Sequence, residues 1–63
     1  MELVLTGKQL VRRLIDEGWI VDRISGSHYI MTKEEKTLSI PVHDGKDLPT
    51  GLLNKLLKQA GLK

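Results

Sequence analysis

The sequence contains no cysteine and no phenylalanine, and it has only one tryptophan and one tyrosine. Without cysteine the chain forms neither a disulfide nor a thiolate metal site. Its two histidines, His28 and His43, lack the clustered spacing of a zinc site, so we expect no metal and no cofactor. A domain of 63 residues buries only about 60% of the surface that its unfolded chain exposes. Stability must therefore come from a small aliphatic core or from a partner.

Long apolar runs are also absent, since no stretch approaches the roughly 20 residues that span a bilayer. Residues 1–6 show no basic region and no cleavage-site pattern, so no signal peptide is expected. Ten Lys and Arg against eight Asp and Glu give a net charge of +2, which permits a polyanionic ligand without requiring one. We expect one cytoplasmic domain, residues 1–63, without membrane contact.

Two segments have the apolar period of an amphipathic helix. In the first, Thr6 and Gln9 fit a capping box and Gly18 is the expected stop. The second is predicted at 51–60, with Thr50 as N-cap and Gly61 as stop. Their apolar stripes consist of Leu10, Val11, Leu14 and Ile15 in the first helix, and Leu52, Leu53, Leu56, Leu57 and Ala60 in the second.

Between the helices the pattern predicts three strands, at 19–25, 28–32 and 37–42. Gly26-Ser27 is a turn signal, and 33–36 is an entirely charged hairpin loop. Short loops join neighbouring strands into an antiparallel meander. Pro41 cannot donate to a ladder, which indicates an edge strand or a strand end.

The expected fold is therefore α+β, in the order α-β-β-β-α. Two helices with matching apolar stripes must bury them, and one face of a three-stranded antiparallel sheet is the available surface. The other face of the sheet is left for solvent or a ligand.

His28 is the first candidate for chemistry because it follows the Gly26-Ser27 turn, and histidine titrates near neutrality. A lone histidine on a strand is nevertheless more often structural or simply exposed than catalytic. The sequence has no serine in a G-x-S-x-G elbow and no glycine-rich nucleotide-binding motif. Composition and spacing alone leave both interpretations of His28 open.

A succession of short motifs runs from Thr6 to Leu62 and resembles the HicA family, small mRNA interferase toxins of type II toxin–antitoxin pairs. The motifs are Gly18-Trp19, Arg23, Gly26-Ser27-His28, Pro41-Val42-His43 and residues 57–62.

The resemblance implies a fold similar to the double-stranded RNA-binding domain. It also implies that His28, the histidine of the G-S-H motif, is catalytic, and that a HicB-type antitoxin covers the active site. It assigns no catalytic role to His43.

Such an activity needs few catalytic groups, because RNA carries its own nucleophile in the 2′-hydroxyl. An imidazole that accepts or donates a proton typically contributes about 10²–10⁴-fold in rate. We expect a metal-independent endoribonuclease that acts on mRNA and makes no DNA contact by itself. The expected phosphate contacts around His28 are the side chains of Arg23, Lys33, Lys36 and Lys46 and the backbone amides of Gly26 and Ser27.

Two other functions stay open. One is a non-catalytic module of the double-stranded RNA-binding type, which recognises the shape of an A-form duplex. The second predicted helix begins without a lysine cluster, which weighs against it. The other is a subunit that only binds a protein partner.

Overall fold

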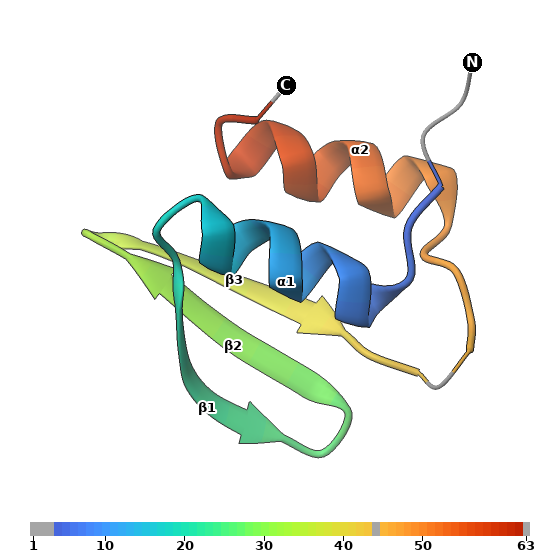
Figure 1. Cartoon of the computed structure of the whole chain (residues 1–63), viewed down its shortest axis with the longest axis horizontal. Helices are drawn as coiled ribbons and strands as arrows, with labels where there is room; N and C mark the ends of the chain where they lie inside the picture. Colours follow the sequence, from blue (N-terminus) through green and yellow to red (C-terminus); the bar gives the residue numbers. More distant parts are fainter. Residues whose placement is uncertain (1–3, 44, 63) are drawn as a thin grey trace.

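The computed structural model describes residues 4–43 and 45–62. Its elements are α1 (Gly7–Asp16), β1 (Ile20–Ser25), β2 (His28–Lys33), β3 (Lys36–Pro41) and α2 (Thr50–Gln59). The three strands form one antiparallel sheet in the order β1-β2-β3. Both helices lie on the same side of this sheet (Figure 1). The predicted α+β fold and its element order are confirmed.

The start of α1 is a complete capping box. The Thr6 hydroxyl accepts from the Gln9 amide at 3.1 Å, and the Gln9 side chain accepts from the Thr6 amide at 2.9 Å. At the other end Gly18 has a φ of 99°, which allows the Trp19 amide to donate to the Leu14 carbonyl at 2.9 Å. Both predicted ends of this helix are confirmed, and the reversal turns Trp19 into the core, so that β1 begins one residue later than expected.

The predicted N-cap of the second helix is wrong. Thr50 is the first residue of α2, and Pro49 precedes it with φ −55° and ψ 140° and without a side-chain cap. The Pro49 carbonyl accepts from the Leu53 amide at 2.9 Å, and the proline ring already holds a helix-compatible φ. The threonine hydroxyl therefore stands one position too late to cap. Gly61 ends the helix as predicted, with the Leu62 amide donating to the Leu57 carbonyl at 2.9 Å.

Two-residue turns join the strands. Gly26-Ser27 connects Ser25 to His28, and residues 34–35 connect Lys33 to Lys36. The predicted charged loop at 33–36 is thus shorter than expected, because its two lysines pair with each other as the last rungs of the ladder. The third strand, predicted at 37–42, runs from Lys36 to Pro41, one residue earlier at each end. Pro41 lies on an edge strand and at its end, which agrees with both alternatives that the sequence left open.

A bulge interrupts β1. Val21 lies opposite Met31 and Arg23 lies opposite Ile30, so Asp22 is the extra residue. Ile24 then lies opposite Tyr29. Directly opposed residues share a sheet face, and Met31 and Tyr29 lie on the side of the helices. The bulge consequently directs two apolar side chains of β1, Val21 and Ile24, toward the helix side.

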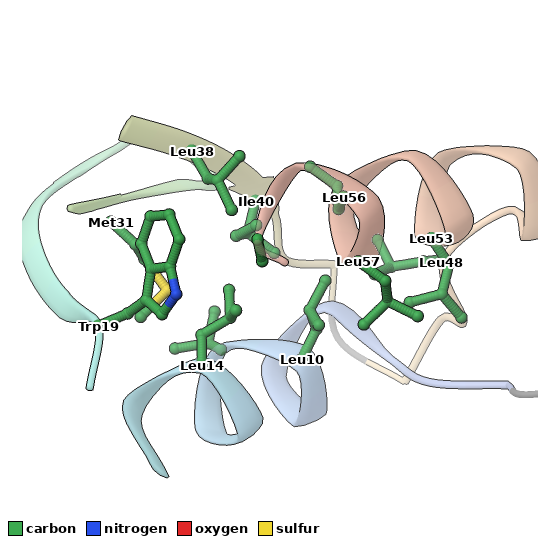
Figure 2. Packing of buried hydrophobic residues seen from close by; sticks show 12 residues of the cluster. Leu10, Leu14, Trp19, Met31, Leu38, Ile40, Leu48, Leu53, Leu56 and Leu57 are labelled. Atoms are coloured by element: carbon green, nitrogen blue, oxygen red, sulfur yellow. The ribbon is translucent and has the colours of Figure 1, made fainter. Parts of the chain in front are cut away.

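The core lies between the helices and the β2–β3 part of the sheet. Figure 2 shows Trp19 beside Met31, with Leu14 of α1 facing Ile40 of β3. The indole Nε1 of Trp19 is buried and has no hydrogen-bond partner. The predicted stripe of α1 is buried except at Ile15, whose exposed fraction is 48%. Ile15 faces an open groove beside α1, so the prediction that it is buried is wrong.

Candidate functional site

His28 is the first residue of β2 and lies in the middle strand of the sheet. Its backbone pairs with Ser25 on one side and Pro41 on the other. The next residue, Tyr29, packs against the core, and residues alternate along a strand. The imidazole therefore lies on the face of the sheet that the helices do not cover, and it is exposed to solvent.

Among the described residues, the His28 side chain has no hydrogen bond or ion pair. Its position is set by the backbone instead. The Ser27 carbonyl accepts from the Val42 amide at 2.7 Å, which ties the turn before His28 to the segment that leaves β3. The backbone of His28 is therefore held at a defined place, while the imidazole nitrogens stay available to a ligand.

The same end of the sheet is braced by the start of α1. A Cβ added to Gly7 would overlap the carbonyl oxygen of Pro41 and lie 2.9 Å from the Cα of Val42. Before Gly7, the Leu5 carbonyl accepts from the Leu48 amide at 2.8 Å. Three chain segments thus converge behind the strand end that carries His28 and pack closely there.

Arg23 lies on the same face as His28. It is opposite Ile30 on β1, and Ile30 lies two residues after His28 on β2. Its side chain is exposed, so the guanidinium is free to contact a ligand that lies across this face. The placement agrees with the predicted phosphate contact, whose role in binding stays a prediction.

Lys46 belongs to the loop that follows β3. This loop leaves the sheet at Pro41, directly opposite His28. The Lys46 amide donates to the His43 carbonyl at 3.1 Å, and both side chains are exposed. The fold therefore brings Lys46 and the second histidine to the same end of the sheet as His28.

Lys33 and Lys36 do not surround His28, contrary to the sequence-based expectation. They close the hairpin at the opposite end of β2, five residues away, which is about 16 Å along a strand. Lys33 also points to the helix side, where its Nζ donates to the Glu17 carbonyl at 2.8 Å, just after α1. The rise of about 3.3 Å per residue sets this distance. The period of two directs Lys33, an odd-numbered residue of β2, to the face opposite that of His28.

Ser25 is a neighbour of His28 that the sequence interpretation missed. It lies directly opposite His28, so both side chains stand on the open face at the distance of a cross-strand pair. The sequence contained this information, because a two-residue turn at Gly26-Ser27 makes Ser25 and His28 a cross-strand pair.

Residues 4–43 and 45–62 contain no candidate metal site and no candidate membrane span. In these ranges no three or more His, Asp or Glu side chains come together in a way that could hold a metal ion. Neither helix is long and apolar enough to cross a bilayer.

Comparison with known proteins gives one clear result. A family described as the HicA toxin of bacterial toxin–antitoxin matches residues 7–62, a range that includes both helices and all three strands. A search of curated proteins found no match. Because the match covers most of the chain, the protein belongs to the HicA family of toxins of bacterial toxin–antitoxin systems.

Proposed function

We propose that this toxin is an endoribonuclease that cleaves mRNA, with His28 as general acid or base. The observation that carries the proposal is the position of the imidazole. It stands exposed on the uncovered sheet face, at a strand end braced by three segments. Proton transfer needs a group on a well-positioned backbone that substrate can reach, and the fixed strand end and the exposed imidazole support the proposal.

In the proposed reaction the 2′-hydroxyl attacks the adjacent phosphorus while the 5′ oxygen of the next nucleotide leaves. His28 either takes the proton from the 2′ oxygen or gives one to the leaving 5′ oxygen. The product ends in a 2′,3′-cyclic phosphate, which water then opens. The second proton transfer is left to water, to the substrate or to another side chain.

The phosphates would be held by groups on the same face and at the same end of the sheet. Arg23 supplies a guanidinium that suits phosphate geometry, and Lys46 supplies a point charge. The backbone amides of Gly26 and Ser27 are further candidates in the tight turn. Lys33 and Lys36 lie too far away to contact the same phosphate, so they would contact only an RNA that runs along the sheet.

We further propose that the antitoxin is of the HicB type and acts as a folded inhibitor over the sheet face that bears His28. Covering this face would make both the His28 imidazole and the Arg23 guanidinium inaccessible to RNA. The net charge of +2 would favour an acidic partner and faster association at low salt. Protection of residues 23–32 from amide exchange in the complex tests this arrangement.

Cleavage of single-stranded RNA by purified protein is the direct test, with His28→Ala and His43→Ala compared. His28→Ala should lose about 10²–10⁴-fold in rate, whereas His43→Ala should lose less than about tenfold. The second variant is a matched control, since it removes an exposed imidazole at the same end of the sheet. Equal losses in both would contradict the single-histidine chemistry, and an unfolded His28→Ala variant would make His28 structural.

Chelation separates this mechanism from a metal-dependent one. Cleavage should persist in excess EDTA, because the 2′-hydroxyl route needs only proton transfer. RNA methylated at its 2′ oxygens should resist cleavage. Activity that disappears in EDTA and returns with magnesium would overturn the mechanism.

A non-catalytic RNA-binding module is the second candidate, and one surface feature favours it. Lys55 and Lys58 of α2 line a shallow hollow with Gly51 and Asn54. Tight binding of duplex RNA that Lys55→Gln and Lys58→Gln weaken, without any cleavage, would support this function instead.

A further inference from the structure

β1 is the least covered part of the molecule. All six of its residues are exposed, including Ile20, Val21 and Ile24. In Figure 1, α1 overlies β3, whereas β1 runs clear of both helices over most of its length. The helix side of β1 is therefore an unpartnered apolar surface, with Ile24 at 56% exposure and Val21 at 37%.

A groove of about 610 Å³ lies next to this surface, between α1 and β2. We call it the α1 groove. Its apolar lining comes from Leu5, Val11, Ile15 and Tyr29. Since Ile24 lies directly opposite Tyr29 on the same face, the apolar lining continues onto β1. Half-exposed Ile15 on one side and Ile24 on the other frame a single apolar surface.

The charges along the α1 groove have one predominant sign. Three cations, Lys8, Arg12 and Arg13, line it against one carboxylate, Asp16, which gives a local charge of +2 (3 − 1). Arg13 is engaged by Glu17 at 3.9 Å, whereas Lys8 and Arg12 have no ion pair among the described residues. A partner that fits must bring carboxylates beside its apolar side chains.

We propose that the α1 groove is a docking site for the antitoxin, filled by an amphipathic segment with apolar side chains along one face and flanking Asp or Glu. The proposal deepens the antitoxin interaction proposed above and rests on it, but it does not depend on the nuclease chemistry. Docking here would add contacts on the helix side to those over His28, so that the antitoxin holds β1 from both faces.

Other occupants suit the groove less well. A second copy of the chain would bring the same cations against Lys8 and Arg12, which repels. Addition of a strand to the β1 edge is hindered by the bulge at Asp22, which twists an edge away from regular pairing. Among the described residues that line the groove, RNA would find a single aromatic side chain for stacking, half-buried Tyr29.

The test measures the affinity between this protein and a purified HicB-type antitoxin, by calorimetry and stopped-flow mixing. Ile15→Asp places a carboxylate in the apolar lining and should weaken binding at least about tenfold, mainly through faster dissociation. Arg12→Glu should slow association and reduce its salt dependence. Lys58→Glu is the matched control on α2, outside the groove, and should bind within about twofold of wild type.

RNA cleavage by each variant alone is the second readout. Unchanged cleavage with weakened antitoxin binding supports the groove, and weakened binding by folded variants supports it even if no form cleaves RNA. Wild-type affinity in Ile15→Asp would overturn the proposal. So would loss of RNA binding in place of antitoxin binding, or self-association of the wild type that Ile15→Asp abolishes while antitoxin affinity is unchanged.

Discussion

The two edge strands of this sheet differ in how far they are buried. β3 contributes Leu38 and Ile40 to the core and lies under both helices, whereas every residue of β1 is exposed. Both strands have six residues and both contain apolar side chains. The difference shows that in so small a domain one half of the sheet holds the fold together. The other half stays exposed.

The largest effect on the free energy of unfolding should come from a substitution on the α1 side of the core. Leu14→Ala removes a fully buried side chain and should lower the free energy of unfolding by about 2–5 kcal/mol. Ile20→Ala, on β1, removes a side chain that is 64% exposed and should change it by less than about 0.5 kcal/mol. Urea titrations followed by circular dichroism measure both. Similar losses would mean that β1 is packed in solution.

A second contrast concerns two helix-starting glycines. Gly7→Ala drives a methyl group into the Pro41 backbone at the end of β3 and should destabilise the domain by about 1–3 kcal/mol. Gly51→Ala, in α2, meets open space and should stabilise it by about 0.4–1 kcal/mol. Thermal melting distinguishes the two signs. A neutral Gly7→Ala would show that α1 does not brace the site.

A smaller effect is expected at the hairpin far from His28. Lys33→Met removes the hydrogen bond to the Glu17 carbonyl and should lower stability by less than about 1 kcal/mol. Cleavage of a short RNA should stay the same, because Lys33 lies about 16 Å along the strand from His28. The expected pattern is a small shift in the melting temperature at constant activity. Lost activity at unchanged stability would return Lys33 to the RNA-binding surface.

The smallest effect on stability should be at the candidate site itself. His28→Ala removes an exposed side chain without a partner among the described residues, so the free energy of unfolding should change by less than about 0.5 kcal/mol. Denaturant titration of the same sample used for RNA cleavage checks this. A large loss would place His28 with the residues that hold the fold together.

Local patterns were enough for much of this architecture. The Thr6–Gln9 capping box and the stop at Gly18 are both present as predicted, and Pro41 lies on an edge strand, one of the two positions expected for it. Each depends on a few neighbouring residues, such as a hydroxyl that reaches an amide three positions on. The second helix started differently, because Pro49 already supplies the helix entry that Thr50 was expected to cap.

The place of His28 after a two-residue turn was also visible in the chain, since Gly26-Ser27 marks it. Its face was not, because apolar residues follow it at both odd and even positions, and only the packing of Tyr29 and Met31 against the core assigns it. Which residues surround His28 was not visible. Lys33 and Lys36 are near it in sequence and far from it on the sheet, whereas Pro41 and the loop carrying Lys46 are distant in sequence and adjacent in space.

By itself, therefore, the sequence determined the elements, their order, the family and the place of His28 after the first strand turn, because caps, turns and periodicity act over a few residues. Only the tertiary structure decided that Asp22 forms a bulge, that Val21 and Ile24 both face the helix side, and that Ile15 lines a groove. These features depend on strand register and on where the helices stop covering the sheet. Contacts between distant segments set both.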